Sequence, residues 1–418
     1  MLEYLNNYLK NKKVLIFGYG REGKSTFNTI KDMNCDITIG DENTINNVEG
    51  YKTISNFNQD DLNNYDIVFK SPGIVLKKDI KELSCVITSQ TNIFLSVYRD
   101  QIIGITASKG KSTTTSLMHH ILRENGFKSL IAGNIGIPMF ELISEIDKDT
   151  KIVLELSCHQ MEYATVSPHI SILLNLYEEH LDHYGTKEKY WAAKQNIYNY
   201  QTNNDYLIIN PVNKPLNYKG HLYLIDPSIL PFNKIEDVSN LRGEHNKFNI
   251  AAIYLVCKLF NINDEQFINS LKTFIPLEHR LEYVGKYNDI DYYNDSISTI
   301  CESCIQALES INNIETILIG GMDRGIDYTP LINYLNNHHI GNIVLMYESG
   351  LRIKDKLNNT NNIVYFNDLY KAFEYSKNNT SKGKAIVLSP AAASYGYFKN
   401  FEERGTIFKQ LVKGDYHG

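Results

Sequence analysis

The chain contains little cysteine and has no strong excess of charge. Its 418 residues include six cysteines, and 42 Lys and Arg against 48 Asp and Glu give a formal net charge of −6. Sparse cysteine fits a reducing compartment, and no basic face stands out that would bind nucleic acid. Cys301 and Cys304 form one C-x-x-C pair, but no second pair and no His-x-x-x-His lie nearby, so we expect no zinc site.

Long apolar runs, repeats and low-complexity tracts are also missing. No run of 18 apolar residues occurs, so we expect no membrane span. The N-terminal segment places its lysines after its leucines and lacks a continuous apolar core, which argues against a secretory signal. We therefore expect a cytoplasmic protein. The 43% apolar content is ample for packed cores, and the length suggests two or three domains.

The most informative stretch is 102–115, which reads IIGITASKGKSTTT. A short β-branched run leads into a turn of small residues, then Lys111 and Ser112, then a helical pattern. This layout is typical of a loop that binds phosphate, because backbone N–H groups at the helix start and the helix dipole both favour an anion. The lysine would reach the terminal phosphates, and the serine hydroxyl could hold Mg²⁺.

An earlier glycine-rich stretch, Gly18–Ser25, matches two motifs. It follows the apolar run 13–17 and fits G-x-G-x-x-G with Asp41 about 20 residues on, as in dinucleotide-binding folds. It also fits the phosphate-loop pattern G-x-x-x-x-G-K-S. From these residues, NAD, a different nucleotide in an open α/β fold and a catalytic ATP loop all remain open. Ser71 follows the next strand, 65–69, at the sheet edge where such folds bind ligands.

Polar residues also follow the expected strands of the central region. Glu155 ends the apolar run 151–156, where a carboxylate is costly unless it is paired. His180 and His183 follow the run 170–176, and one of the two is expected to be structural. A carboxylate and an imidazole beside a triphosphate would suit Mg²⁺. Polar side chains before the helix 249–260 would either cap it or reach a purine base.

Eight short motifs then occur in one order along the chain. They are Gly-Lys-Ser-Thr, Gly-Asn-Ile-Gly-x-Pro, Leu-Glu-Leu-Ser, His-Leu-Asp-His before Ala-Ala-Lys, His-Asn-x-x-Asn, His-Arg, Asn-Asp-Ser, and Ser-Pro-Ala-x-Ala-Ser followed by Phe-Lys-Asn-Phe-Glu-x-Arg-Gly. In this order they resemble the Mur ligases of peptidoglycan synthesis over essentially the whole chain. The tail resembles the members that add D-glutamate.

The resemblance implies an α/β fold of three domains. Residues 1–98 would form a Rossmann-like domain that binds a UDP-sugar, and residues 99–280 a central domain with a P-loop ATPase-type mononucleotide-binding sheet. Residues 281–418 would form a C-terminal Rossmann-like domain that binds the amino acid. The implied cofactors are ATP and Mg²⁺, and the implied partners are UDP-N-acetylmuramoyl-L-alanine and D-glutamate. We expect a monomer.

The resemblance also implies the site residues. The UDP-sugar would contact Gly18, Gly20, Arg21, Glu22, Asp41, Ser71, Asn134 and Ser157. ATP would contact Ser108, Lys109, Gly110, Lys111, Ser112, Thr113, Asn246, Asn249, Arg280 and Asp295. D-glutamate would contact Thr299, Arg324, Ser394, Tyr395 and Phe401. The catalytic set would be Lys111, Glu155, His180 and Lys194. The metal ligands would be Ser112, Glu155, His180 and, if carbamylated, Lys194.

The implied activity is an ATP-dependent amide ligation through an acyl phosphate. The chain departs from the family pattern at Ala107, Ile297, Arg324 and Gly396. Ala107 replaces a loop glycine, which would cost on the order of 1 kcal/mol if that position needs a positive φ. Alternatives are a related ligase for another amino acid, folate-type polyglutamylation, a nucleotide-sugar-binding protein with weakened catalysis, and a dehydrogenase. No hydride-handling site supports the last.

Overall fold

A computed structural model describes residues 1–135, 137–177, 181–239, 241, 244–311, 313–358 and 361–416. The chain forms two compact units, Met1–Asn233 with Asn246–Phe274, and Lys234–His245 with Ile275–Gly418. Three mostly parallel sheets with helices confirm the predicted α/β fold class. The predicted domain boundaries near residues 98 and 280 stay a prediction. Among the helices of the described chain, none is long and apolar enough to cross a membrane.

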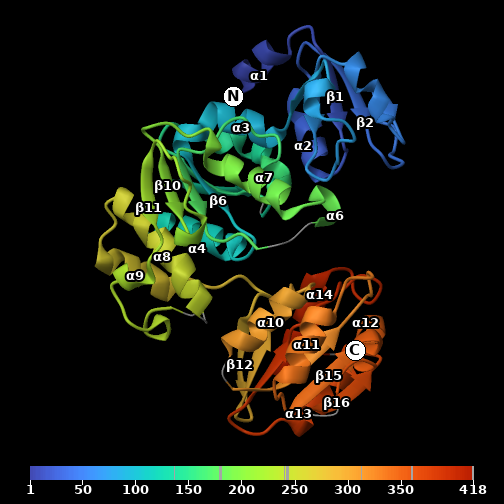
Figure 1. The fold of residues 1–418 in the computed structure, drawn as a ribbon, viewed down its shortest axis with the longest axis vertical. Coiled ribbons are helices and arrows are strands. Elements are labelled where there is room, and N and C mark those ends of the chain that lie inside the picture. The colour runs from blue at the N-terminus through green and yellow to red at the C-terminus, as the bar shows by residue number, and fades with distance from the viewer. Residues whose placement is uncertain are drawn as a thin grey trace. The chain divides into compact units, whose positions relative to one another are not determined.

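The first sheet lies in the first unit and has the strand order β3-β2-β1-β4-β5, all parallel. Figure 1 labels its strands β1 and β2 in the blue N-terminal part of the chain. Its strands are β1 (Lys13–Phe17), β2 (Asp36–Gly40), β3 (Lys52–Ile54), β4 (Ile67–Lys70) and β5 (Val86–Thr88). Its helices are α1 (Leu2–Leu9), α2 (Arg21–Ile30) and α3 (Gln90–Tyr98). The order reverses between β1 and β4, so the loops after β1, β2 and β4 meet at the edge where doubly wound sheets bind nucleotides.

The central sheet, also in the first unit, has the order β11-β10-β9-β6-β8-β7 and is parallel throughout. Its strands are β6 (Ile102–Thr106), β7 (Ser129–Gly133), β8 (Lys151–Glu155), β9 (Ile170–Leu173), β10 (Tyr206–Ile209) and β11 (His221–Leu224). The helices are α4 (Lys111–Glu124), α5 (Cys158–Met161), α6 (Leu181–Tyr184), α7 (Lys187–Asn199), α8 (Glu244–Leu259) and α9 (Asp264–Thr273). Because β8 and β9 flank β6, the residues after all three strands share one edge.

The third sheet forms the core of the second unit, with the order β12-β13-β17-β14-β15-β16. Its strands are β12 (Glu282–Tyr287), β13 (Ile290–Asn294), β14 (Ile314–Gly320), β15 (Asn342–Met346), β16 (Asn362–Phe366) and β17 (Ala385–Leu388). The helices are α10 (Cys301–Ser310), α11 (Thr329–Asn337), α12 (Tyr347–Lys354), α13 (Leu369–Asn379) and α14 (Phe401–Lys413). β12 runs antiparallel to β13, and β13, β17 and β14 are neighbouring parallel strands.

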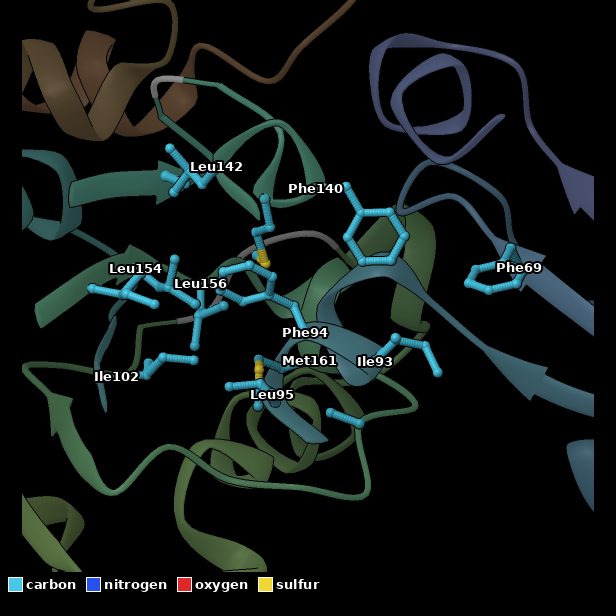
Figure 2. Packing of buried hydrophobic residues seen from close by; sticks show 14 of the residues in the cluster. Phe69, Ile93, Phe94, Leu95, Ile102, Phe140, Leu142, Leu154, Leu156 and Met161 are labelled. Atoms are coloured by element: carbon cyan, nitrogen blue, oxygen red, sulfur yellow. The ribbon is translucent and has the colours of Figure 1, made fainter. Parts of the chain in front are cut away.

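One apolar cluster joins the first and central sheets. It contains Phe69 from β4, Phe94 from α3 and Leu154 from β8, and all three are buried. Figure 2 shows the labelled side chains of β4, α3 and β8 together in this cluster. Helix α3 therefore supplies apolar side chains to a core that both sheets of the first unit share.

Candidate active site

The predicted phosphate loop connects β6 to α4. Gly110 stands immediately before α4 with φ of 89°, a left-handed conformation that glycine adopts without strain. A side chain at this position would also approach Asn249 Nδ2 to 2.9 Å. Ala107 is buried and is not among the described residues with positive φ. The departure at Ala107 therefore carries no backbone strain, because the left-handed turn falls three residues later.

Two residues outside the predicted set hold this loop in place. The backbone N–H of Lys109 donates to Asn175 Oδ1 at 2.8 Å, and Asn175 Nδ2 donates to the Lys109 carbonyl oxygen at 2.9 Å. The Ser108 and Tyr190 hydroxyls lie 2.9 Å apart. Asn175 follows β9, and its position after an apolar strand is the only feature of the sequence that could have marked it as a site residue. Tyr190 lies on α7, and only the folded chain brings it to the loop.

Asn246 and Asn249 lie one turn apart on α8, which starts five residues earlier than the sequence predicted. Asn249 Nδ2 donates to Asn246 Oδ1 at 3.2 Å, and the closeness of Asn249 to Gly110 places this turn beside the phosphate loop. Of the ten predicted ATP contacts, eight therefore belong to one region of the first unit. Arg280 and Asp295 belong to the second unit.

Two lysines meet at one carbonyl oxygen. Lys111 Nζ donates to the Ala107 oxygen at 2.9 Å, and Lys194 Nζ, from α7, donates to the same oxygen at 2.8 Å. Lys194 is 1% exposed. Two ammonium groups that share one oxygen repel each other, and a neighbouring anion or the conversion of one lysine to a neutral or acidic group would lower that repulsion.

Glu155 lies at the end of β8, paired in register with Ile105 of β6. Its Oε1 accepts a hydrogen bond from Asn134 Nδ2 at 2.7 Å, whereas its buried Oε2 has no hydrogen-bond partner among the described residues. A buried carboxylate oxygen without a donor suits a divalent cation. Ser112, buried in the first turn of α4, would supply a second hard oxygen. This donor set fits Mg²⁺.

His180 lies outside the described residues, so the structure does not place this predicted metal ligand. His183 is placed, and its Nε2 lies 3.3 Å from Glu162 Oε2. Its ring centroid also lies 4.4 Å from that of His159. His183 thus has protein partners of the kind expected for the structural member of the pair.

The predicted UDP-sugar residues of the first sheet come together at the edge after β1, β2 and β4. Gly18 has φ of 93°, and Ser71 Oγ donates to its carbonyl oxygen at 2.7 Å. Asp41 Oδ2 accepts from the Tyr19 N–H at 2.7 Å. A side chain at Gly23 would come within 2.0 Å of the Gly18 oxygen. Gly20 caps α2, which continues through Arg21 and Glu22.

The other two predicted UDP-sugar residues lie on the central sheet. Asn134 follows β7, and its N–H donates to the Glu155 oxygen at 2.9 Å. Ser157 caps α5 in a capping box with Gln160. These two residues therefore bracket Glu155, which makes the end of β8 a point where ATP and UDP-sugar contacts would meet.

In the second unit, Asp295 follows β13 and is buried. Its carboxylate accepts hydrogen bonds from Ser298 Oγ, from Ser389 Oγ at 2.8 Å and from the Leu281 N–H at 3.0 Å. Burial raises the pKa of Asp295 from its usual 3.8 to about 6, opposed by these hydrogen bonds and by Arg280. The Arg280 Nε is buried and has no hydrogen-bond partner within the described chain. It can therefore donate a hydrogen bond to an acceptor atom of a bound ligand.

Arg404, which was assigned no role from the sequence, links three segments of this unit by hydrogen bonds. Its guanidinium is fully buried and donates to Ser296 Oγ at 3.0 Å, to the Ser296 oxygen at 2.8 Å and to the Ala392 oxygen at 3.1 Å. Burial lowers its pKa to about 10. Next to it, a side chain at Gly405 would come within 2.2 Å of His279 Nδ1. The His-Arg, Asn-Asp-Ser and Arg-Gly motifs thus meet in one packing arrangement.

The predicted D-glutamate residues lie on loops around this arrangement. Ser394 is buried and follows β17, and the Phe401 oxygen accepts from Ser296 Oγ at 2.8 Å. Met322 and Ala393 form an antiparallel bridge, which brings the loop that carries exposed Arg324 beside the Ser394 segment. Tyr395 is exposed and Thr299 is partly buried, and within the described chain neither forms a hydrogen bond to this cluster.

Comparison with known proteins identifies the class of protein. A family model described as the Mur ligase middle domain matches residues 105–222. The chain is 30% identical to the UDP-N-acetylmuramoylalanine–D-glutamate ligase of Clostridium kluyveri, with 97% of both chains covered. It is 31% identical to the ligase of the same name from Oenococcus oeni, with 97% of this chain and 98% of the relative covered.

Solved structures agree on the fold. The MurF ligase of Thermotoga maritima, solved with ADP, has a TM-score of 0.62 at 14% identity, with 98% and 97% of the two chains covered. The UDP-N-acetylmuramate–alanine ligase MurC of the same organism has a TM-score of 0.55 at 15% identity, with 97% and 100% covered. The two ligases at 30% and 31% identity define the class as an ATP-dependent ligase. The chain belongs to the Mur ligase family.

The predicted family, the ligase class and the use of ATP with Mg²⁺ are thereby confirmed. The individual site residues stay predictions, and what the structure adds is their surroundings. It brings together the phosphate loop, Glu155 and Lys194 in the first unit. In the second, it brings together Asp295, Ser394 and Phe401 around Arg404.

The buried carboxyl group of Asp295 makes stability depend on pH. The folded chain keeps this proton up to about pH 6, whereas the unfolded chain releases it near 3.8, so the stabilising contribution of the protonated form is lost as pH rises between these values. Asparagine does not titrate. We therefore expect the free energy of unfolding of Asp295→Asn, taken relative to that of the wild type at the same pH, to rise by about 1–3 kcal/mol from pH 4 to pH 7.

The measurement is urea unfolding followed by hydrogen exchange in peptides that cover β13 and β17. Asp355→Asn, at an exposed position after α12, is the matched control and should show no such gain. A stability difference between Asp295→Asn and wild type that is constant from pH 4 to pH 7 would contradict the account.

Proposed function

We propose that this chain joins D-glutamate to UDP-N-acetylmuramoyl-L-alanine at the expense of ATP, in the synthesis of peptidoglycan precursors. The observation that carries the proposal is the match over 97% of the chain to relatives that bear the name of this ligase, at 30% and 31% identity. Residues 1–98, 99–280 and 281–418 would bind the UDP-sugar, ATP and the amino acid. We further propose a cytoplasmic monomer.

The first chemical step activates a carboxylate, which is a poor electrophile. An oxygen of the alanyl carboxylate attacks the γ-phosphorus of ATP, so that an acyl phosphate forms and ADP leaves. Lys111 would orient the transferring phosphoryl group and balance its charge from the loop that Asn175 holds in place. Bound Mg²⁺ would neutralise charge on the phosphate oxygens, held by Ser112 and by the open oxygen of Glu155.

The second step forms the amide bond. The uncharged amine of D-glutamate attacks the acyl carbon, phosphate leaves with one former carboxylate oxygen, and the amine loses a proton. The amino acid brings two carboxylates to the site. The exposed guanidinium of Arg324 offers paired donors for one of them. The Ser394 hydroxyl and neighbouring backbone N–H groups would bind the other.

We also propose that Lys194 is carbamylated. Addition of CO₂ to its uncharged amine forms an N–C bond, releases a proton and turns a cation into an anion. This change would relieve the repulsion between the Lys194 and Lys111 ammonium groups, which both donate to the Ala107 oxygen at 2.8 and 2.9 Å. It would also place a negative group beside the site proposed for Mg²⁺.

Phosphate release tests the proposed function. With UDP-N-acetylmuramoyl-L-alanine, ATP and Mg²⁺ present, we expect sustained release of phosphate only after D-glutamate is added. Lys111→Ala should abolish ATP turnover, whereas Lys24→Ala, which alters an exposed lysine of α2, should retain it. Equal phosphate release with L-alanine or L-lysine would contradict the proposed specificity.

The carbamate proposal has a separate test. Lys194→Ala should lose ligase activity, and a short carboxylic acid supplied with bicarbonate should partly restore it, because a free carboxylate can occupy the vacated space. Lys187→Ala on the same helix is the control, since its side chain is exposed. Full activity of Lys194→Ala without any addition would refute the role.

A further inference from the structure

A group of charged side chains joins the first sheet to the central sheet, and the proposed mechanism does not use its lysine. Lys70 is the last residue of β4 and is 4% exposed. Its Nζ lies 3.4 Å from Glu162 Oε2 and donates to the Ser71 oxygen at 3.4 Å. Glu162 follows α5 of the central sheet. The ion pair therefore connects two sheets within one compact unit.

Glu22 brings a second carboxylate to this group. It lies in the first turn of α2, within the Gly18–Gly23 loop, and its Oε1 is buried without a hydrogen-bond partner among the described residues. Burial raises the pKa of Glu22 to about 7, while Gln160, Lys70 and Arg21 act in the opposite direction. Burial likewise lowers the pKa of Lys70, and Glu162 and Glu22 oppose that shift. The Lys70 ammonium thus acts on two carboxylates, and Arg21 acts on Glu22 as well.

These contacts converge on a short segment of the central sheet. Gln160 faces the Glu22 carboxyl group and lowers its pKa, and Gln160 Oε1 accepts a hydrogen bond from the Ser157 N–H at 3.1 Å. Glu162, two residues further on, contacts His183 at 3.3 Å. The Ser157–Glu162 segment is therefore held on one side by the glycine loop and β4, and on the other by α6.

We propose that Lys70 is a positioning residue for the sugar nucleotide, and that its pairing with Glu162 fixes the Gly18–Gly23 loop against the Ser157–Gln160 turn. This inference rests on the proposed function. The link from Lys70 to the loop is short, because the adjacent Ser71 donates to the Gly18 oxygen at 2.7 Å and a side chain at Gly18 would come within 2.8 Å of Ser71 Cβ.

The charge of Lys70 has a second effect on the same loop. The N-terminus of α2 is where the diphosphate of a sugar nucleotide would bind, and a carboxylate in that turn opposes an anion. The Lys70 ammonium offsets the Glu22 charge there. Removing the ammonium would release the end of β4 from Glu162 and would remove a buried cation that acts on both Glu162 and Glu22, a change that is costly in a region of low dielectric.

The experiment measures binding of UDP-N-acetylmuramoyl-L-alanine and of ATP separately, by calorimetry on the full chain. We expect Lys70→Met to weaken binding of the sugar nucleotide by about tenfold or more and to change the Kd of ATP less than twofold. Lys70→Arg should restore part of the affinity because it keeps the charge. In the ligase assay, the KM for the sugar nucleotide should rise more than kcat falls.

Lys128→Met is the matched control, because Lys128 forms a 2.6 Å ion pair with Asp147 in the same unit but both side chains are about half exposed, at 47% and 53%. It should bind both ligands as the wild type does. Should Lys70→Met not fold, Lys70→Met with Glu162→Gln removes the pair without leaving Glu162 charged, and it should show the same selective loss.

Two results would overturn the inference alone. One is wild-type affinity for the sugar nucleotide in a folded Lys70→Met protein or in the double variant. The other is an equal loss of affinity for the sugar nucleotide and for ATP, which would indicate a general structural role. Absence of sugar-nucleotide binding by the wild-type chain would instead overturn the proposed function, and this inference with it.

Discussion

The sharing of one carbonyl oxygen by two lysine ammonium groups is the constraint on which the central site depends. Lys111 reaches the Ala107 oxygen from α4 and Lys194 reaches it from α7, so two helices converge on the residue that follows β6. Anions nearby lower the repulsion between like charges this close. A nucleotide triphosphate, the Glu155 carboxylate and a carbamate on Lys194 are the three anions that our account places there.

The parallel sheets explain why such residues gather. Loops at the carboxyl ends of neighbouring parallel strands meet at one edge, and β6, β8 and β9 are neighbours in the central sheet. The same rule brings together Gly18, Asp41 and Ser71 in the first sheet, and Asp295 and Ser389 in the third. Each of the three sheets thus gathers its predicted site residues in the same way, on short polar or glycine-containing turns that follow buried parallel strands.

Much of this arrangement could be predicted because buried parallel strands are continuous apolar runs between turn residues. Strands β10 and β17 have the bounds that the sequence predicts. Strand β12 was not predicted, because it is a partly exposed edge strand with lysine and glycine in it and lacks such a run. Asn175 and Arg404 could not be assigned either, since Asn175 binds Lys109, 66 residues away along the chain, and Arg404 binds Ser296, 108 residues away. Ala107 raised the question of backbone strain only because the sequence does not tell which loop residue adopts positive φ.

The central claim is that the chain activates a carboxylate by phosphoryl transfer at the loop that Lys111 follows. The most direct measurement uses UDP-N-acetylmuramoyl-L-alanine labelled with ¹⁸O in its alanyl carboxylate, with ATP, Mg²⁺ and D-glutamate, and determines the isotope content of the released phosphate by mass spectrometry. An acyl phosphate transfers one carboxylate oxygen to phosphate, so the account predicts one ¹⁸O atom in each phosphate released. Unlabelled phosphate, formed together with the amide product, would contradict it.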